Sequence, residues 1–408
     1  MGKHIVIVNA HWNNRGDEAA LRPMIDEILM ACDQCKITVI FKDNNGILKF
    51  PYGKRVEAWG AKFLPSNIME LMLSVISKGK WSRNELLRKE VKCISNCDLI
   101  IYSPGGSVIC DKFWWRKQLE YLLPFLCADF YKIPMIVAAP SIGPFHNSIW
   151  KNCIRKRLLS VPQKICVREE ISKKYLKKIG VCNHVISTID TAFYDMPETE
   201  KNNNILIKDK ALTDFLQKYS KVVGMTISDF SWHVKLSKNR DLALDIEDIM
   251  KMFIRELNLQ EIGVILIPQL FGNENDSKYL ERFRQEKTFI LSEEYDTYFQ
   301  QFLISKLYAV VGMRYHSNIF SAKMATPFLA IAYEDKMRGF MKAAGIRRYM
   351  LEVESISYEK LESKWKELVL GYDKYKLFLQ KQHEKWKNSA GKTMKMIRDE
   401  LKEERSYQ

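Results

Sequence analysis

Several features that would assign the chain to a special class of protein are missing from the sequence. It has no uninterrupted apolar run near the ~18 residues that a membrane-spanning helix needs; the apolar stretch at 119–130, for example, is broken by Glu120, Pro124 and Asp129. It has no low-complexity tract, no repeat of 20–50 residues and no apolar signal core before Ile5. These absences exclude fibrous and solenoid proteins, and we expect a globular cytoplasmic protein that is soluble or peripheral to a membrane.

The cysteines do not form a recognisable framework. There are nine, an odd number, at irregular spacing. Cys32 and Cys35 make one Cys-x-x-Cys, with no second pair and no nearby histidine to complete a metal site. We therefore expect free thiols, as in a reducing cytoplasm, and neither a metal site nor a disulfide framework.

The chain has fewer acidic than basic residues. The chain carries 64 Lys and Arg against 49 Asp and Glu, a formal net charge of +15. This excess favours anionic partners such as phosphorylated metabolites or lipid head groups. The lysines are spread along the chain without an arginine-rich run or an aromatic RNA-binding signature, so we expect no nucleic acid partner.

The 408 residues, 47% of them apolar, are enough for two domain cores. Short apolar segments, each followed by polar residues and then a helical pattern, predict parallel βαβ units in a doubly wound sheet. The predicted strands are Ile5–Asn9, Ile37–Phe41, Asp98–Ser103, Met135–Ala139, Ile165–Arg168, Val185–Ile189, Lys221–Ile227, Val264–Pro268, Thr288–Leu291, Ala309–Gly312 and Phe328–Ala332. The polar stretch Pro197–Lys210 is interpreted as a linker between two such series.

The predicted fold class is therefore α/β, with two Rossmann-like lobes in a glycosyltransferase-B-like arrangement that binds ligands between the lobes. The predicted domains are 1–197, 198–354 and a C-terminal helical segment, 355–408, that crosses back. A one-sided apolar face in this segment, which includes Tyr375 and Trp386, suits packing across a domain.

The segment from Ala309 to Phe340 carries three basic side chains just after two buried strands. Arg314 and His316 follow the first strand, and Lys336 follows the second. Because ligands of open α/β sheets bind at the carboxyl ends of strands, and because a helix begins after His316, this segment predicts an anion site. The alternative is a solvated arginine and a structural histidine.

Two further loops follow predicted strands. In the first, Asn14-Arg15-Gly16-Asp17-Glu18-Ala19, the acidic pair at a helix start disfavours phosphate and suits either sugar hydroxyls or helix capping. In the second, Gly105 and Gly106 let a ligand approach the backbone closely, and Asp111 follows them.

The segment Ala58–Arg83 predicts an apolar helix flanked by Trp59, Trp81 and several cations. Such a composition suits a membrane interface. The alternative is an ordinary core helix with a basic end.

Together, motifs spread over residues 5–345 resemble the polysaccharide pyruvyltransferase family. They are Asn14–Ala19, Gly105-Gly106-Ser107 with Asp111, Gly143-Pro144-Phe145, Arg168 with Ser172, Asp190–Phe193, Gly312–His316 and Tyr333–Lys336. The family has a third glycine where this chain has Ser107, and residues after about 355 match no motif.

The resemblance implies transfer of a pyruvyl group from phosphoenolpyruvate to two hydroxyls of a sugar, which gives a cyclic ketal and phosphate without a metal or cofactor. It implies that the first lobe serves the acceptor and the second the donor. The implied roles are general acid/base for His316; handling of the acceptor hydroxyl for Asp17 and Glu18; donor binding for Arg314, Lys336 and Arg168; and acceptor binding for Asn14, Gly105, Gly106 and Asp111.

The net charge and the segment Ala58–Arg83 favour an acceptor linked to polyprenyl diphosphate, as in capsule or exopolysaccharide synthesis, at the inner face of the cell membrane. Two alternatives stay open at this point. One is a glycosyltransferase that uses a sugar nucleotide, with Glu334 or Asp335 holding a ribose. The other is a non-catalytic module of a polysaccharide assembly complex.

Overall fold

The computed structural model describes residues 2–42, 50–61, 68–106, 109–112, 115–182, 184–230, 240–272 and 275–402. The chain divides into two compact units. The first contains Met1–Asn13, Asp17–Tyr194 and Asn388–Gln408, and the second contains Asn14–Gly16 and Asp195–Lys387. The change of unit at Tyr194 comes three residues before the predicted boundary, and the segment predicted as a third part, 355–408, is divided between the two units.

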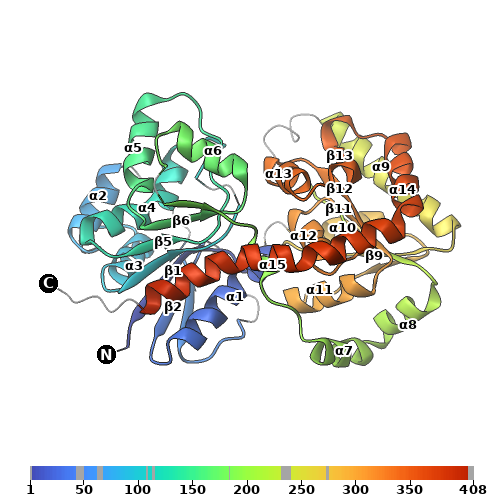
Figure 1. Ribbon diagram of the computed structural model, residues 1–408, viewed down its shortest axis with the longest axis horizontal. Helices are drawn as coiled ribbons and strands as arrows, with labels where there is room; N and C mark the ends of the chain where they lie inside the picture. The colour runs from blue at the N-terminus through green and yellow to red at the C-terminus, as the bar shows by residue number, and fades with distance from the viewer. Residues whose placement is uncertain are drawn as a thin grey trace. The chain divides into compact units, whose positions relative to one another are not determined.

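The first unit is built on a parallel sheet of seven strands within its described residues, in the order β3-β2-β1-β4-β5-β6-β7. Figure 1 labels β1, β2, β5 and β6 of this sheet. Its strands are β1 (His4–Ala10), β2 (Lys36–Phe41), β3 (Val56–Gly60), β4 (Leu99–Tyr102), β5 (Met135–Val137), β6 (Lys164–Val167) and β7 (Val185–Ser187). Its helices are α1 (Arg15–Ala31), α2 (Ile68–Ile76), α3 (Glu85–Ile94), α4 (Trp115–Tyr131), α5 (Ile149–Leu159), α6 (Glu170–Lys178) and the 3₁₀ turn η1 (Thr191–Phe193).

The second unit has a parallel sheet of six strands within its described residues, in the order β10-β9-β8-β11-β12-β13. These are β8 (Val222–Thr226), β9 (Gly263–Leu266), β10 (Thr288–Ile290), β11 (Ala309–Gly312), β12 (Phe328–Ala332) and β13 (Met350–Glu352). The helices are α7 (Thr199–Lys208), α8 (Lys210–Lys218), α9 (Arg240–Leu259), α10 (Asp276–Leu280), α11 (Thr297–Lys306), α12 (Tyr315–Lys323), α13 (Asp335–Ala343), α14 (Tyr358–Leu370) and α15 (Tyr372–Lys402). Three short 3₁₀ turns are η2 (Glu281–Phe283), η3 (Arg347–Tyr349) and η4 (Val353–Ser355).

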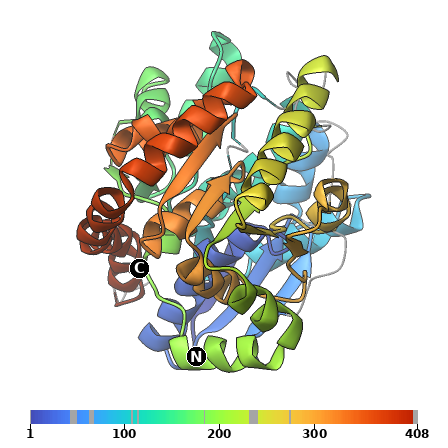
Figure 2. The ribbon, with the colours of Figure 1, turned by 90° about the vertical axis from the view of Figure 1, so that its right-hand side faces the viewer.

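Both sheets are buried on two faces, as parallel sheets are. In β1, Val6 and Val8 belong to one apolar cluster, whereas Ile5 and Ile7, on the opposite face, belong to another. All four side chains are 0% exposed, and each contributes about 1.5–3 kcal/mol relative to an exposed side chain. In the second unit α9 and α14 pack together (Figure 2), with an edge-to-face contact between Phe253 and Trp365.

The C-terminal helix α15 contributes to both units: its residues up to Lys387 group with the second and the later ones with the first. Its apolar face is buried as predicted. Tyr375 and Trp386 lie in the core of the second unit, and Met394 and Ile397 join the apolar cluster that lines one face of the first sheet.

Two predicted segments differ from the structure. Pro197–Lys210, interpreted as a linker, is mostly the helix α7, which buries only Asn202 among its described side chains. A polar surface helix of this kind leaves little apolar periodicity in the sequence. The segment Ala58–Arg83, expected to be one helix, begins inside strand β3 and continues in α2, with 62–67 outside the described residues.

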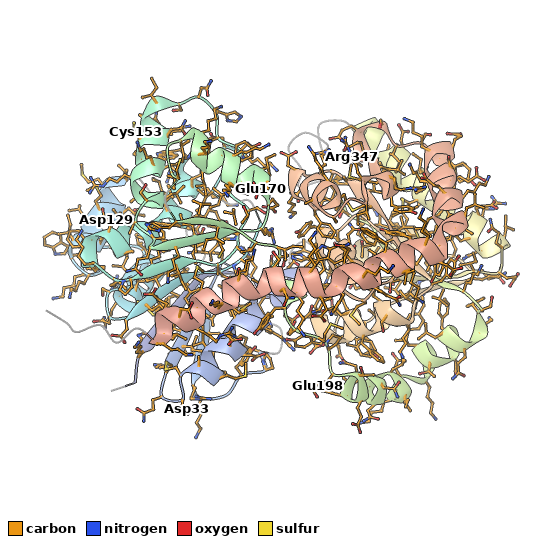
Figure 3. The ribbon with its side chains drawn as sticks, in the orientation of Figure 1. Asp33, Asp129, Cys153, Glu170, Glu198 and Arg347 are labelled. Carbon is orange, nitrogen blue, oxygen red and sulfur yellow. A yellow bond between two sulfur atoms is a disulfide. The ribbon has the colours of Figure 1, made fainter. Side chains whose placement is uncertain are left out.

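The expectation that every cysteine is a free thiol is wrong for one pair. Cys32 and Cys35, in the turn after α1, form a disulfide, and their Cα atoms lie 5.5 Å apart. The turn brings them within reach, since the Cys35 amide donates to the Cys32 carbonyl. Of the free cysteines, Cys153 on α5 and Cys182 are exposed (Figure 3 labels Cys153). Among the described helices, none is both long and apolar enough to span a bilayer.

Each sheet has one point where the strand order reverses, and ligands of open α/β sheets bind outside the carboxyl ends of the strands there. In the first unit this point lies between β1 and β4, and in the second between β8 and β11. Residues after β4 and β11 include Gly105, Gly106, Arg314 and His316, so the sequence motifs fall at both reversal points.

Candidate functional site

The turn after β11 is held rigid by buried polar contacts. The Arg314 amide donates to the Thr226 hydroxyl at the end of β8 (3.2 Å), and that hydroxyl is also in hydrogen-bond contact with the Ser317 hydroxyl (2.7 Å). The Asn318 side-chain amide donates to the Arg314 carbonyl at 3.2 Å. These contacts join the two strands that flank the reversal point, and they fix the start of α12, which carries His316.

The loop Asn14–Gly16 belongs to this second unit. The Arg15 amide donates to the Gln269 carbonyl (2.9 Å), and the Arg15 guanidinium donates to the Glu293 carbonyl (2.7 Å). Within the loop, the Asn14 side-chain oxygen accepts from the Gly16 amide at 2.9 Å. The side chain of Asn14 therefore shapes the turn, and the expectation that it binds the acceptor stays a prediction.

Gly16 lies directly against the imidazole of His316. A Cβ on Gly16 would sit 1.8 Å from the His316 Nδ1 atom and 2.0 Å from Cγ. His316 is 6% exposed, with its ring 4.9 Å from the ring of Tyr315 and 6.2 Å from that of Phe320. The loop motif and the histidine motif, far apart in sequence, thus form one site, and only glycine fits at position 16.

Arg314 is buried and paired with a carboxylate that the sequence analysis did not identify. Its guanidinium donates to both oxygens of Asp276, whose Oδ2 also accepts from the amides of Gln269 (3.0 Å) and Leu270 (2.9 Å). Burial by itself lowers the pKa of Arg314, but Asp276 outweighs it and the pKa is raised. The guanidinium is therefore permanently charged and fixed in direction, with its charge partly balanced.

Lys336 also has a carboxylate partner, since its Nζ lies 2.7 Å from Glu334. The same ammonium lies over the ring of Tyr315, 5.4 Å from its centre. Tyr315 separates Arg314 from His316 in sequence and also contacts the His316 ring. The structure thus brings His316 and Lys336 to one tyrosine, which directly follows Arg314 in the chain.

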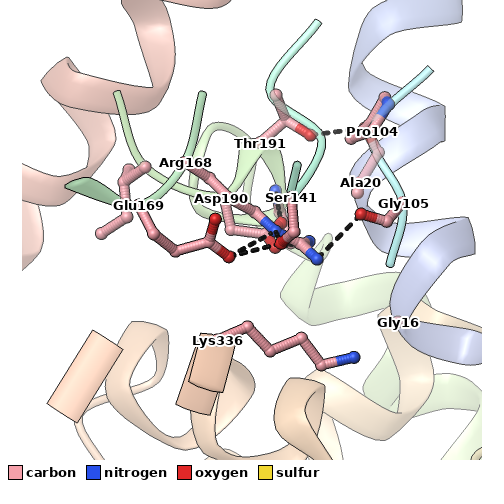
Figure 4. A network of polar contacts seen from close by, with 12 residues as sticks. Gly16, Ala20, Pro104, Gly105, Ser141, Arg168, Glu169, Asp190, Thr191 and Lys336 are labelled. Carbon is pink, nitrogen blue, oxygen red and sulfur yellow. Dashed lines mark hydrogen bonds and ion pairs between the residues drawn. The ribbon is translucent and has the colours of Figure 1, made fainter. Parts of the chain in front are cut away.

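In the first unit, Arg168 is the centre of a buried network (Figure 4). Its Nη1 donates to Asp190 (2.6 Å), its Nε to Ser141 (2.9 Å) and Glu169 (3.1 Å), and its Nη2 to the Gly105 carbonyl (2.9 Å). The Arg168 side chain is 0% exposed. A guanidinium so enclosed ties four strand-end loops together, which differs from the expectation of a cation presented to a donor.

The remaining motif residues of this unit extend the same network. The Ser172 hydroxyl donates to Glu169 (3.0 Å) and accepts from the Ile142 amide (2.9 Å), next to the Gly143-Pro144 turn. Ser107, which stands where the family has a glycine, lies outside the described residues. Gly106 is half-buried, and an added Cβ there would meet nothing within 4 Å.

Asp111 lies in a separate cluster. It accepts two hydrogen bonds from Arg155 (2.5 and 3.1 Å) and one from the His146 amide (2.6 Å). Burial raises the pKa of Asp111, but the hydrogen bonds from Arg155 and His146 outweigh it, so the pKa is lowered. The carboxylate is thus ionised and held by the buried Arg155; acceptor binding by Asp111 stays a prediction.

The acidic pair at the start of α1 occupies two environments. Glu18 is fully buried and lies 2.7 Å from Arg22, one helical turn away, which suits the structural alternative. Asp17 is half-buried in the first turn of the helix. Of the two carboxylates, Asp17 is therefore the more accessible.

Asn9 is a candidate that the sequence analysis missed. It sits at the end of β1, where the register shifts between Ile7 and Ala10, and its φ is +59°. Its side chain is 0% exposed, and no described residue hydrogen-bonds to its amide nitrogen or oxygen. Bulges of this kind often re-aim side chains next to active sites. Asn9 lies beside Gly105, 3.4 Å from where a Cβ would stand, at the reversal point of the first sheet.

The other candidate site residues that the sequence did not predict are Glu169 and Asp276. Glu169 directly follows Arg168, so its place after a strand was a usable signal. Asp276 begins the short helix α10, well beyond the end of β9, and no spacing in the sequence relates it to Arg314. Among the described residues, no group of three or more His, Cys, Asp and Glu side chains is placed to hold a metal ion.

Comparison with known proteins places these motifs in a family. The family described as polysaccharide pyruvyl transferase matches residues 14–335. The amylovoran biosynthesis protein AmsJ of Erwinia amylovora is 23% identical over 382 residues, which cover 87% of this chain and 89% of the relative. Both findings agree with the resemblance seen in the motifs.

Similar solved structures share the fold at low sequence identity. A putative UDP-N-acetylglucosamine 2-epimerase from Listeria monocytogenes has a TM-score of 0.61 and 10% identity, with 99% of this chain and 98% of that chain covered. A ugt transferase from Siraitia grosvenorii has a TM-score of 0.55 and 10% identity, with 98% and 100% covered. Together with the two parallel sheets, these neighbours confirm the predicted α/β fold class of glycosyltransferase-B type.

Proposed function

The chain belongs to the polysaccharide pyruvyl transferase family, and we propose that it moves the pyruvyl group of phosphoenolpyruvate onto two hydroxyls of one sugar. The family makes the protein a transferase, and the relative AmsJ supports a role in polysaccharide synthesis. In the proposed reaction the products are a cyclic pyruvate ketal and inorganic phosphate. The acceptor is a sugar of a polysaccharide or its polyprenyl-diphosphate-linked precursor.

The observation that carries the proposal is the position of His316. Its imidazole packs against Gly16 of the Asn-x-Gly-Asp-Glu loop, and the adjacent Tyr315 is covered by Lys336. Arg314 directly precedes Tyr315 in the chain, and its guanidinium is fixed by Asp276. An imidazole in the same segment as these two cations can move a proton next to an anionic substrate, which is what the donor requires.

The proposed reaction balances in two steps. His316 delivers a proton to the methylene carbon of phosphoenolpyruvate, which becomes a methyl group, and the neighbouring carbon becomes oxocarbenium-like. A sugar hydroxyl attacks that carbon and gives its proton to a base, which restores the proton count. The second hydroxyl then displaces phosphate, and its proton leaves with the phosphate.

The donor carries a phosphate and a carboxylate, which charge-assisted hydrogen bonds from arginine and lysine would hold. We assign this role to Arg314 and Lys336. Their carboxylate partners Asp276 and Glu334 set the direction of each cation. For Arg168 we propose an indirect role, since its guanidinium is enclosed by the network that positions the Gly105 loop.

For the acceptor we propose that Asp17 receives the hydroxyl proton, because it is the more accessible of the two carboxylates in its motif, with Glu18 fixing the helix start through Arg22. Asn14, Gly105, Gly106 and Asp111 would shape the surrounding loops. No step in this scheme calls for a metal or a cofactor.

The test is to incubate the purified protein with phosphoenolpyruvate and a lipid extract from a polysaccharide-producing strain. We expect release of phosphate and a new ketal methyl signal in the NMR spectrum of the sugar product. His316→Gln should lower the rate by roughly 10²–10⁴-fold, as is usual for a general acid/base. His383→Gln is the matched control, since His383 lies on α15 and bonds to the Lys323 carbonyl.

Two outcomes would contradict the proposal. One is release of a nucleoside diphosphate from a sugar nucleotide with no phosphate from phosphoenolpyruvate, which would indicate a glycosyltransferase. The other is full activity of His316→Gln, which would remove His316 from the chemistry.

A further inference from the structure

Helix α2 is apolar on nearly all sides, although much of it is exposed. Its sequence, Ile-Met-Glu-Leu-Met-Leu-Ser-Val-Ile, has Glu70 as its one charged residue. The side that packs on the first unit consists of Leu71, Ser74 and Val75, and the Val75 carbonyl accepts a hydrogen bond from Tyr131 of α4. A helix that is apolar all round is normally buried in a core or in a membrane, and α2 buries only one side.

The opposite side of α2 is a continuous apolar surface. Five residues at alternating steps of one and three positions along the helix share this face, and their exposure ranges from 39% for Leu73 to 67% for Met69. We call these residues, together with Trp81, which is 69% exposed, the α2 face. It consists of Ile68, Met69, Met72, Leu73, Ile76 and Trp81.

Basic residues border the α2 face on the loop that follows the helix. Lys78, Lys80 and Arg83 are all exposed. The helix ends in a Schellman motif, in which the Gly79 amide donates to the Ser74 carbonyl (2.7 Å) and the Lys78 amide to that of Val75 (3.0 Å). The chain therefore turns back at once, and the cations stay next to the end of the apolar surface.

The loop itself is anchored. The Trp81 amide donates to the Ser77 hydroxyl (3.0 Å), and the Arg88 guanidinium of α3 donates to the Ser82 carbonyl (3.3 Å). An added Cβ on Gly79 would lie 2.7 Å from the Arg88 carbonyl, so the loop packs closely on α3. Trp81 and the cations are thus presented by a fixed platform.

We propose that the α2 face docks on an anionic membrane surface. Apolar side chains of this size enter the boundary between head groups and acyl chains, tryptophan favours that boundary, and flanking lysines and arginines attract anionic lipids. Each cation close to the surface strengthens binding, and the net charge of +15 adds long-range attraction.

Charge argues against a second copy of the chain as the occupant. A two-fold interface places the same patch on both sides, so Lys78, Lys80 and Arg83 would approach a surface that carries the same cations and no acidic cluster. Among the described residues of α2 and the loop to Arg83, Glu70 is the single acidic side chain. A membrane rich in phosphatidylglycerol supplies the missing negative charge.

Docking does not depend on the reaction proposed above. If that function holds, the docked protein would meet a lipid-linked acceptor at the surface where the lipid resides. This last step, and only this step, rests on the proposed function. The assay below contains no phosphoenolpyruvate, so its failure and the failure of the proposed function are distinguishable.

The test is co-sedimentation of the full chain with vesicles of phosphatidylglycerol and phosphatidylcholine, or of phosphatidylcholine alone. We expect binding to the anionic vesicles that weakens at high salt, and at least tenfold less bound protein on neutral ones. The double variant Met69→Glu/Met72→Glu should lose at least tenfold in binding with an unchanged melting temperature, because both side chains are exposed. The double variant Lys78→Glu/Lys80→Glu should lose the salt-sensitive part of its binding to anionic vesicles.

The matched control is Met252→Glu/Leu259→Glu on α9, which places the same two charges at exposed apolar positions of the second unit. It should bind vesicles like the wild type. The proposal is overturned if the wild type does not sediment with anionic vesicles, or if the control loses as much binding as the α2 variant. It is also overturned if light scattering shows a dimer that Met69→Glu/Met72→Glu dissociates, since a second copy would then cover the face.

Discussion

Replacement of Gly16 by alanine should inactivate the enzyme without unfolding it. The new Cβ would lie 1.8 Å from the His316 Nδ1 atom, 2.0 Å from Cγ and 2.5 Å from the His316 Cβ. Ordinary contact begins at 3.4 Å, so the imidazole or the loop must move by about 1.6 Å. Misplacement of a catalytic group by ~1 Å can cost ~10²-fold in rate. We therefore expect Gly16→Ala to lose at least roughly 100-fold in turnover.

The effect on stability should be small, because two contributions oppose each other. Overpacking of a buried site typically costs about 1–3 kcal/mol. Alanine in place of glycine within a helix, here in the first turn of α1, gains about 0.5–1 kcal/mol. The melting temperature should thus fall by a few degrees at most, whereas activity falls steeply.

Two assays measure the change. One is phosphate release from phosphoenolpyruvate in the presence of the lipid extract; the other is the ketal pyruvate content of polysaccharide from cells that carry the substitution. Gly53→Ala is the matched control, since a Cβ at Gly53 would meet nothing within 4 Å, and it should behave as wild type.

A double variant separates this mechanism from a general disturbance. If Gly16→Ala acts by displacing His316, adding it to His316→Ala should cost little more activity, because residues that act as one unit are non-additive. Full additivity of the two losses would contradict the reasoning. So would a Gly16→Ala enzyme that keeps more than a tenth of wild-type turnover.

Two further predictions concern the first unit. Asn9→Gly preserves the left-handed backbone but removes the buried side-chain amide, which we expect to hydrogen-bond the acceptor. Acceptor-dependent turnover should therefore fall roughly 10-fold, the effect of one lost hydrogen bond, at an unchanged melting temperature. Ala139→Gly, at φ +55°, is its control, and wild-type turnover of Asn9→Gly would mean that the amide contacts no substrate. Lys42→Met removes the cation 3.0 Å from the buried carboxylate of Glu90, which should cost about 3–5 kcal/mol of unfolding free energy at pH 8. Burial raises the pKa of Glu90, and Lys42 partly offsets this rise. Without Lys42 the pKa of Glu90 should rise further. The loss of unfolding free energy in Lys42→Met, measured by calorimetry, should therefore grow as the pH rises from 5 to 8. Equal losses at both pH values would refute this reasoning.

Much of the fold follows from local sequence patterns. An apolar run such as Ile5–Val8, with polar residues after it, favours a buried parallel strand, because a sheet covered on both faces buries every side chain of such a strand. The strand-end positions of Gly105 in the first sheet, and of Arg314 and His316 in the second, follow in turn, since each comes just after a strand.

Two elements depend on tertiary neighbours that no local sequence pattern reveals. The last three residues of β3, from Ala58, were expected to be part of a helix. The strand forms because Val56–Gly60 pairs with β2, from Ile37↔Val56 to Phe41↔Gly60. Among the described residues of the segment predicted as an apolar helix, α2 alone is helical. Whether its Met69 side lies in a core or in solvent depends on which neighbours pack against it.

The sequence by itself determined the fold class, the family and the positions of the basic side chains, because each is encoded in residues a few positions apart. Only the tertiary structure decided which charges are balanced and which groups meet. Asp276, beyond the end of β9, pairs with Arg314, and Gly16, from the loop after β1, touches His316. Such contacts join distant parts of the chain, so hydrogen bonding and steric fit in the folded units select them, and no local sequence pattern does.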